Sequence, residues 1–156
     1  MKKYLVVGNP INHSLSPLIH NLWIKENNIK SIYDSQKLNS QDLGKLILSI
    51  REGKISGANI TVPFKRDIIS FLDKLSPEAK DTQSVNTIYL KDNEITGHNT
   101  DITGFKKSIE DIKFNVTGKK ILILGAGGVV PSIIYALNKM KASQIMISNR
   151  TKSNAD

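Results

Sequence analysis

Apolar and polar residues follow one another in a pattern that predicts alternating strands and helices. Short apolar runs bounded by polar, glycine or proline residues are typical of buried strands, whereas apolar residues three and four positions apart are typical of helices. By these criteria we expect strands at 2–8, 31–38, 57–61, 85–90, 94–99, 121–125 and 144–149. The expected helices begin near Ser16, Ser40, Asp67, Ser76, Thr100 or Asp101, and Gly128.

Two of these expected helices have an apolar face that can be read directly. The helix that begins at Ser16 has Pro17 in its first turn, where proline gives up no needed N–H group. We expect Ser16 and Ser40 to cap their helices. The face of the first helix holds Leu18, Leu22 and Trp23, and we expect Trp23 to lie in the core. The face of the second holds Leu43, Leu46, Ile47 and Ile50, and Gly53 ends that helix.

The order of these elements predicts two parts of an α/β fold. Residues 1–101 form an α/β domain that closes with a β-hairpin turning at Lys91-Asp92-Asn93. Residues 102–156 hold a helix, a linker at 113–120 and a strand–turn–helix–strand series, which is typical of the first βαβ unit of a Rossmann-type dinucleotide-binding domain. Because a single βαβ unit cannot cover both faces of a parallel sheet, we expect the sequence to be part of a longer chain.

Composition limits the class of protein. The 156 residues are 39% apolar and 23% charged, carry a net charge of +8 and include no cysteine, so disulfides and thiolate metal ligands are excluded. The lysines stand singly or in pairs, which indicates a solvated basic surface rather than a nucleic-acid-binding face. The N-terminal apolar stretch stops at Gly8, too early for a signal peptide, and the uncharged run 121–137 contains GAGG and a proline. We expect a cytoplasmic protein with no membrane or nucleic-acid partner and no metal site.

A glycine-rich turn, GAGGVV, follows the strand expected at 121–125. In that position backbone N–H groups and a helix N-terminus can bind a pyrophosphate. Glycines have no side chain that would block the approach of the pyrophosphate to the backbone. The turn residues are Gly125, Ala126, Gly127 and Gly128. After the next strand stand Asn149, Arg150 and Thr151 instead of the acidic residue of an NAD site, which favours NADP, since a guanidinium and a hydroxyl suit a 2′-phosphate. A plain tight turn and a solvated Arg150 remain the alternatives.

Two further stretches, GANITVPFK and GHNTD, bring a single lysine and a single aspartate into polar surroundings. Small hydroxyl and amide residues, which suit a polyhydroxylated ligand, occupy both regions: Asn59, Thr61, Asn86, Thr87, Asn99 and Thr100. If Lys65 lay beside Asp101, the pair could pass a proton to or from a substrate oxygen. Spacing alone leaves open the alternative that Lys65 is a solvated lysine after a turn.

Taken together, these stretches resemble the shikimate dehydrogenase family, the NADP-dependent enzymes that interconvert 3-dehydroshikimate and shikimate. The resemblance covers nearly the whole chain and rests on GNPINHSLSP (8–17), GANITVPFK (57–65), SVNTIY (84–89), GHNTDITGF (97–105), GAGG (125–128) and NRT (149–151). It implies an oxidoreductase of aromatic amino acid biosynthesis. The expected partners are the small-molecule substrate and, as one option, a second copy of the chain in a homodimer.

The resemblance also implies roles for individual residues. Ser14 and Ser16 would bind the substrate carboxylate, and Lys65 with Asp101 would form the acid–base pair. The ring hydroxyls would be met by Asn59, Thr61, Asn86 and Asp101, with Lys65 reaching the reacting oxygen. The cofactor pyrophosphate would lie on Gly125–Gly128 and its adenosine 2′-phosphate on Asn149, Arg150 and Thr151.

The sequence departs from the family pattern at a few places. Gln83-Ser84 replace a small Gly-Ala pair, Pro131 stands in the first turn of a helix, and a C-terminal portion with nicotinamide and substrate contacts is missing. Three other readings therefore stand beside shikimate dehydrogenation. They are a relative that also accepts quinate, a non-catalytic substrate-binding fragment, and a fragment with no function of its own.

Overall fold

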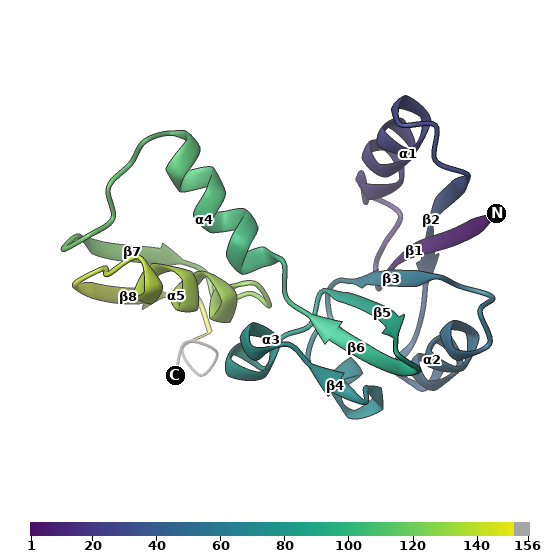
Figure 1. Cartoon of the computed structure of the whole chain (residues 1–156). Coiled ribbons are helices and arrows are strands. Elements are labelled where there is room, and N and C mark those ends of the chain that lie inside the picture. The colour runs from purple at the N-terminus through teal and green to yellow at the C-terminus, as the bar shows by residue number, and fades with distance from the viewer. Residues whose placement is uncertain (152–156) are drawn as a thin grey trace. The chain divides into compact units, whose positions relative to one another are not determined.

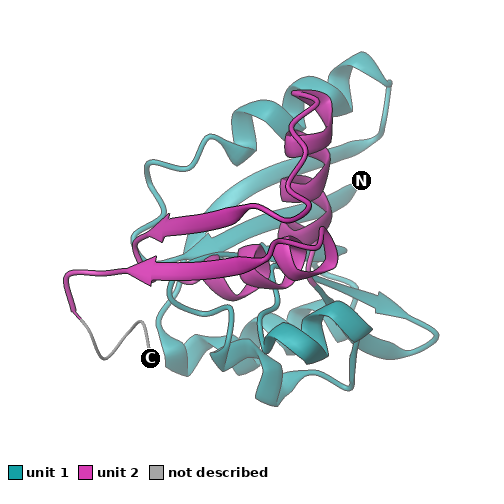
Figure 2. Ribbon diagram, turned by 90° about the vertical axis from the view of Figure 1, so that its left-hand side faces the viewer, with its two compact units in different colours: residues 1–98 teal, residues 99–156 magenta. Residues whose placement is uncertain are grey.

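The computed structural model describes residues 1–151 and divides the chain into two compact units, the first comprising Met1–His98 and the second beginning at Asn99 (Figure 2). Both units combine helices with a sheet, so the α/β class predicted from the sequence is confirmed. Each unit is described separately below.

Unit 1 is built on a six-stranded mixed sheet with the order β2-β1-β3-β5-β6-β4. Its strands are β1 (Lys2–Gly8), β2 (Ser31–Lys37), β3 (Gly57–Ile60), β4 (Lys74–Leu75), β5 (Thr87–Lys91) and β6 (Glu94–His98). β1 runs parallel to β2 and β3, whereas β5 is antiparallel to β3 and β6. The two-residue strand β4, which pairs with β6, was not predicted from the sequence.

The expected hairpin joins β5 to β6. Its two turn residues, Asp92 and Asn93, have φ values of 51° and 63°. Positive φ at both central residues is the geometry whose twist matches that of paired strands, and Asp and Asn tolerate it better than most residues. The local sequence therefore explains why the chain reverses here.

Alternation along the strands gives the unit 1 sheet two different faces. The back face carries Leu5, Val7, Ala58, Ile60 and Ile88, which form the main core together with α2 (Leu43–Arg51). The front face carries Tyr4, Val6, Asn59 and Thr87, and α1 (Ser16–Glu26) packs over its β1–β2 side. In Figure 1, α1 and α2 lie on opposite sides of the sheet. The short helices η1 (Ser40–Asp42), η2 (Asp67–Phe71) and α3 (Pro77–Thr82) complete this unit.

The apolar faces predicted for α1 and α2 differ in burial. In α2 the predicted residues Leu43, Leu46, Ile47 and Ile50 are all buried, which confirms the prediction. In α1 no residue is buried, and Trp23, expected in the core, is 52% exposed. The stripe faces away from the sheet, because the side of α1 that meets β2 carries His20, Asn21 and the partly buried Ile24.

Two predicted helix caps were wrong by one or two residues. Ser16 lies inside α1, and its backbone N–H donates to the Oγ of Ser14 at 3.3 Å. Ahead of α2, a capping box joins Asn39 with Asp42 in place of a cap by Ser40. The helix start predicted near Ser76 is confirmed, and the Oγ of Ser76 caps α3 by accepting from the N–H of Ala79.

Unit 2 contains α4 (Asp101–Asp111), β7 (Lys120–Leu124), α5 (Val130–Lys139) and β8 (Gln144–Ser148). β7 and β8 pair in parallel, so the predicted βαβ unit is confirmed. Pro131 falls in the first turn of α5, as expected. Ile112, the residue directly after α4, is 70% exposed. Among residues 1–151, no helix is long and apolar enough to cross a membrane.

Candidate functional site

Polar loops meet at the carboxyl ends of β1 and β3, where ligands commonly bind in open α/β sheets. The N–H of Asn9, just after β1, donates to the carbonyl of Val62, just after β3, at 3.0 Å. Gly8 allows this approach, because a Cβ at that position would lie 2.6 Å from Cγ2 of Thr61. The first two sequence motifs, 8–17 and 57–65, are thus brought together.

Lys65 is held next to the start of β5. The preceding residue, Phe64, is 1% exposed and belongs to the main core, so it anchors the segment that carries the lysine. The carbonyl of Lys65 accepts from the N–H of Val85 at 2.9 Å, and Asn86 follows directly. Lys65 and Asn86 are both half-buried. Their backbones approach each other where the carboxyl end of β3 lies beside the start of β5.

Asn59 is held from two sides on the front face. Its Oδ1 accepts from the Tyr33 hydroxyl at 2.5 Å. Its Nδ2 donates to the backbone carbonyl of Asn86 at 3.2 Å and to Oγ1 of Thr87 at 3.1 Å. The structure thereby brings together four predicted site residues of unit 1 at neighbouring strand ends: Asn59, Thr61, Lys65 and Asn86.

Ser14 lies in the loop after β1, and Ser16 is the first residue of α1. Ile11, which is buried against Val6 and Tyr33, holds this loop to the front face. The N–H of Ser14 donates to the Ile11 carbonyl at 3.0 Å, so the serine follows a turn fixed by that anchor. Both serines are half-buried in unit 1.

Tyr33 is a site neighbour that the sequence analysis missed, whereas Thr87 was expected there among the small polar residues of the two regions. Burial raises the pKa of Tyr33 to about 12, so its hydroxyl stays protonated and remains a donor across physiological pH. His20 stacks on the Tyr33 ring at 4.1 Å, and burial lowers the pKa of that imidazole. The period of two along a strand predicts that Thr87 and Tyr89 share one face of the sheet. It does not predict that Thr87 meets Asn59, because these two residues lie on different strands that are distant in the sequence.

Asp101 is the first residue of α4 and belongs to unit 2. Its N–H donates to Oδ1 of Asn99 at 3.0 Å, and Nδ2 of Asn99 donates to Oγ of Ser132 on α5 at 2.8 Å. Asn99 and Ser132 are fully buried, so they fix the start of α4 against α5. The predicted pair of Lys65 and Asp101 would join residues of both units.

The glycine-rich turn of unit 2 has room for a phosphate group. Gly125 has φ +104°, a conformation that favours glycine, and within the described residues 1–151 no heavy atom lies within 4 Å of the positions that a Cβ would take at Gly127 or Gly128. Asn149, Arg150 and Thr151 follow β8, whose carboxyl end lies beside that of β7 because the strands are parallel. The side-chain Nδ2 of Asn149 donates to the Thr151 carbonyl at 2.8 Å. These residues fit a dinucleotide with a 2′-phosphate.

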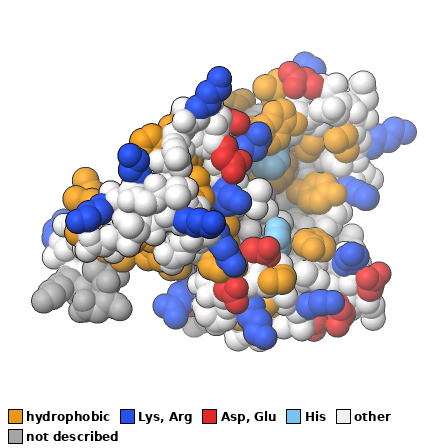
Figure 3. All heavy atoms as spheres, turned by 60° about the vertical axis from the view of Figure 1, so that its left-hand side comes forward, with side chains coloured by type: hydrophobic (Ala, Val, Ile, Leu, Met, Phe, Trp, Pro, Cys, Tyr) orange, Lys and Arg blue, Asp and Glu red, His pale blue; other side chains and the backbone are white. Residues whose placement is uncertain are grey.

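Figure 3 shows Lys and Arg side chains spread over the face in view, interleaved with acidic and apolar ones. Within residues 1–151, no group of three or more His, Asp or Glu residues could hold a metal ion.

Comparison with known proteins gives consistent matches. The family model for the shikimate dehydrogenase substrate binding domain matches residues 6–88. The shikimate dehydrogenase (NADP(+)) of Pelagibacter ubique is 57% identical over 154 residues, which cover 99% of this chain and 58% of that relative. The chain therefore spans less than two thirds of that relative's length.

Solved structures agree with this match. The crystal structure of shikimate dehydrogenase from Aquifex aeolicus superposes with a TM-score of 0.92 at 39% identity, covering 99% of this chain and 58% of that one. The enzyme from Thermus thermophilus, solved in complex with NADP(H) and shikimate, gives a TM-score of 0.89 at 30% identity, again with 99% and 58% coverage.

Proposed function

The chain belongs to the family defined by the shikimate dehydrogenase substrate binding domain, and on this premise we propose that it acts in an NADP-dependent oxidoreductase. The proposed reaction is the reversible reduction of 3-dehydroshikimate to shikimate, within aromatic amino acid biosynthesis. The observation that carries the proposal is the convergence of Asn59, Thr61, Lys65 and Asn86 at the carboxyl ends of β1 and β3. A solved relative that binds shikimate and NADP(H) supports it.

The residues of unit 1 have the chemistry that this substrate needs. Ser14, in the loop after β1, and Ser16, at the start of α1, offer hydroxyl donors to the carboxylate. Asn59, Thr61 and Asn86 offer uncharged donors and acceptors for the ring hydroxyls. Lys65, half-buried and anchored through Phe64, is the cation of the site.

We assign proton transfer to Lys65 together with Asp101. In the reducing direction NADPH supplies the hydride to the carbonyl carbon, and the pair delivers a proton to the carbonyl oxygen. In the oxidising direction the pair takes that proton back. Two interacting groups titrate as a unit, so the proton is assigned to the pair and not to one member.

Unit 2 would hold the cofactor. Backbone N–H groups of the turn Gly125, Ala126, Gly127 and Gly128 would bind the pyrophosphate at the start of α5. Arg150, with Asn149 and Thr151, would bind the 2′-phosphate that distinguishes NADP from NAD. The space beside Gly127 and Gly128 supports this assignment.

An NMR titration of the 156-residue chain with shikimate tests substrate binding. We expect backbone and side-chain shifts to cluster at Ser14, Ser16, Asn59, Thr61 and Asn86, and to weaken in a Lys65→Met variant. Lys45→Met is the matched control, since this lysine has an 83% exposed side chain and lies on α2, which packs on the opposite face of the sheet.

Each outcome of the titration has a definite meaning. Clustered shifts that weaken in Lys65→Met and persist in Lys45→Met support the assigned site, and NADPH consumption with 3-dehydroshikimate then tests turnover. A folded chain that shows no shifts at millimolar shikimate would contradict the proposal for this chain. Shifts with no turnover would favour the reading of a non-catalytic substrate-binding fragment.

A separate comparison of cofactors tests Arg150. We expect Arg150→Leu to weaken binding of NADP by roughly tenfold, the usual scale of one charge-assisted contact, and to leave NAD binding nearly unchanged. Equal losses for both cofactors would contradict a contact with the 2′-phosphate.

A further inference from the structure

Side chains from three strands of unit 1 form one hydrogen-bonded chain on the front face. The Tyr33 hydroxyl, from β2, donates to Oδ1 of Asn59 on β3 at 2.5 Å. Nδ2 of Asn59 donates to Oγ1 of Thr87 on β5 at 3.1 Å, and Oγ1 of Thr87 donates to Oδ1 of Asn86 at 3.1 Å. We call these four residues the relay. It leads from α1's contact with Tyr33 to a predicted substrate-binding amide.

One backbone carbonyl determines the orientation of the Asn59 amide in the relay. The carbonyl of Asn86 can only accept, and it lies 3.2 Å from the side-chain amide of Asn59. The NH2 end of Asn59 must therefore face that carbonyl, so its oxygen faces Tyr33 and the phenol must donate. Asn59 gives its second hydrogen to Thr87, and the hydroxyl of Thr87 donates its own hydrogen to Oδ1 of Asn86.

The register of the sheet explains why these residues meet. Tyr33 pairs with Tyr4 on β1, Val6 pairs with Asn59, and Asn59 pairs with Thr87. Paired residues of neighbouring strands project from the same face. The relay therefore runs diagonally across one face, from the row of Tyr33 to the row of Asn59 and Thr87.

The start of the relay is held rigidly. Tyr33 is 4% exposed, and its ring stacks on His20 with 5° between the planes. Its backbone N–H donates to Oδ1 of Asn21, and its carbonyl accepts from Nδ2 of the same residue, at 3.0 and 2.7 Å. Two residues of α1 thus hold both the ring and the backbone of Tyr33.

We propose that Tyr33 is a positioning residue that acts through Asn59 and Thr87 to fix the orientation of the Asn86 side-chain amide. With Oδ1 of Asn86 turned toward Thr87, the Nδ2 end of that amide points away from Thr87 and presents a donor in one defined direction. The importance of this orientation for substrate binding rests on the proposed function, in which the Asn86 side chain contacts a ring oxygen of the substrate. Asn59 uses both of its amide hydrogens inside the relay, so it can meet a ligand only through a remaining lone pair of Oδ1.

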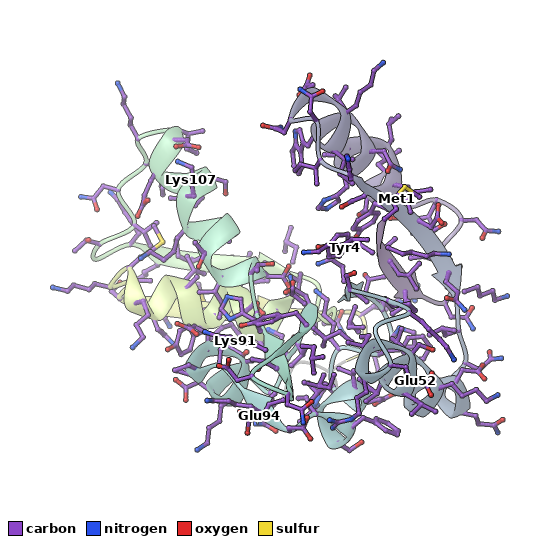
Figure 4. The ribbon with its side chains drawn as sticks, turned by 45° about the vertical axis from the view of Figure 1, so that its right-hand side comes forward. Met1, Tyr4, Glu52, Lys91, Glu94 and Lys107 are labelled. Atoms are coloured by element: carbon purple, nitrogen blue, oxygen red, sulfur yellow. The ribbon has the colours of Figure 1, made fainter. Side chains whose placement is uncertain are left out.

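The first test needs no ligand. Tyr33→Phe removes one hydroxyl and keeps the ring against His20. We expect the side-chain NH2 cross-peaks of Asn59 and of Asn86 to shift in the NMR spectrum, although Asn86 lies at the opposite end of the relay from Tyr33. The matched control is Tyr4→Phe, which removes the same group from the same face of the sheet outside the relay (Figure 4). An unchanged Asn86 cross-peak in Tyr33→Phe would overturn the proposal.

A second pair of variants breaks the relay at its next link. Thr87→Val replaces the hydroxyl by a methyl group of similar size, and Thr87→Ser keeps the hydroxyl. We expect the valine variant to shift the Asn86 side-chain cross-peak and the serine variant to restore it. If valine and serine give the same Asn86 cross-peak as the wild type, the hydroxyl does not orient the amide and the proposal is overturned.

Shikimate binding then separates this proposal from the proposed function. We expect Tyr33→Phe to raise the dissociation constant of shikimate about fivefold, the factor that corresponds to one net hydrogen bond, and Tyr4→Phe to leave it unchanged. An unchanged constant in Tyr33→Phe overturns the positioning role. If the wild-type chain binds no shikimate, the proposed function fails for this chain, and the Asn86 cross-peak alone decides whether the relay exists.

Discussion

Replacing Gly8 by alanine would place a methyl group where β1 passes the loop that follows β3. The added Cβ would lie 2.6 Å from Cγ2 of Thr61, 3.0 Å from the carbonyl oxygen of Val62 and 3.2 Å from Cδ1 of Ile11. The Val62 oxygen is backbone and accepts the N–H of Asn9, so it cannot move without shifting the loop. The substitution therefore strains the fold at the candidate site itself.

The expected cost follows from these distances. Carbon atoms in contact normally stay about 3.5–4.0 Å apart, so Thr61 must move by about 1 Å. Overpacking of this kind costs about 1–3 kcal/mol. Alanine also lowers the conformational entropy of the unfolded chain, which raises the free energy of unfolding by about 0.4–1 kcal/mol. We expect Gly8→Ala to lower the free energy of unfolding by about 1.3 kcal/mol, the difference between the midpoints of these two ranges.

Urea unfolding followed by tryptophan fluorescence measures this change in unit 1, because Trp23 is the only tryptophan of the chain. Gly44→Ala is the matched control in the same unit. It lies in α2, and its added Cβ would meet Phe71 at an ordinary 3.5 Å. Alanine favours a helix over glycine, so we expect this variant to be more stable by about 0.5–1 kcal/mol.

The two alanine variants should move in opposite directions. A Gly8→Ala chain as stable as the wild type, with Gly44→Ala shifted as expected, would refute the argument from close approach. If Thr61 contributes to binding, Gly8→Ala should also weaken shikimate binding at temperatures where it remains folded, whereas Gly44→Ala should not.

Three further predictions concern unit 1. Ser76→Ala removes the cap of α3 and should lower the free energy of unfolding by about 1 kcal/mol, measured in urea. Phe64→Ala, at a residue 1% exposed, should cost about 3–5 kcal/mol; amide hydrogen exchange should then speed up across the main core. The N–H of Ile95 and the Arg51 guanidinium hold the pKa of Asp73 below its usual 3.8, so stability should be full above that pH and fall as pH drops further. Asp73→Asn should flatten this acid limb, and an unchanged pH profile would contradict the assignment.

The apolar pattern predicted elements better than it predicted burial. Leu43, Leu46, Ile47 and Ile50 were expected to share a face and are buried, whereas Leu18 and Trp23 were expected to share a face and are exposed. Periodicity along one helix shows which residues lie on a common face. Whether another element covers that face depends on contacts far away in the sequence. For α1, the side that meets the sheet is the one with His20 and Asn21.

Helix starts show a second, more local limit. Several capping residues stand near each start, such as Ser14 beside Ser16 and Asn39 beside Ser40, and all have side chains suited to the role. The choice depends on the φ and ψ angles at the junction, which the preceding loop imposes. Ser76 was predicted correctly because Pro77 fixes the next residue in the first helical turn.

The candidate site shows the same division between local and distant information. The motif around Lys65 could be read from the sequence, because glycine, proline and lysine stand close together in a short segment. The link from Tyr33 to Asn86 could not, since it needs the registers of β1 with β2, β1 with β3, and β3 with β5. Period-two alternation places core residues and site residues on opposite faces of the same strands, as Ile60 and Asn59 show. A packing change on the back face can therefore shift a strand and turn an amide on the front face, so stability and ligand recognition in this unit depend on one register.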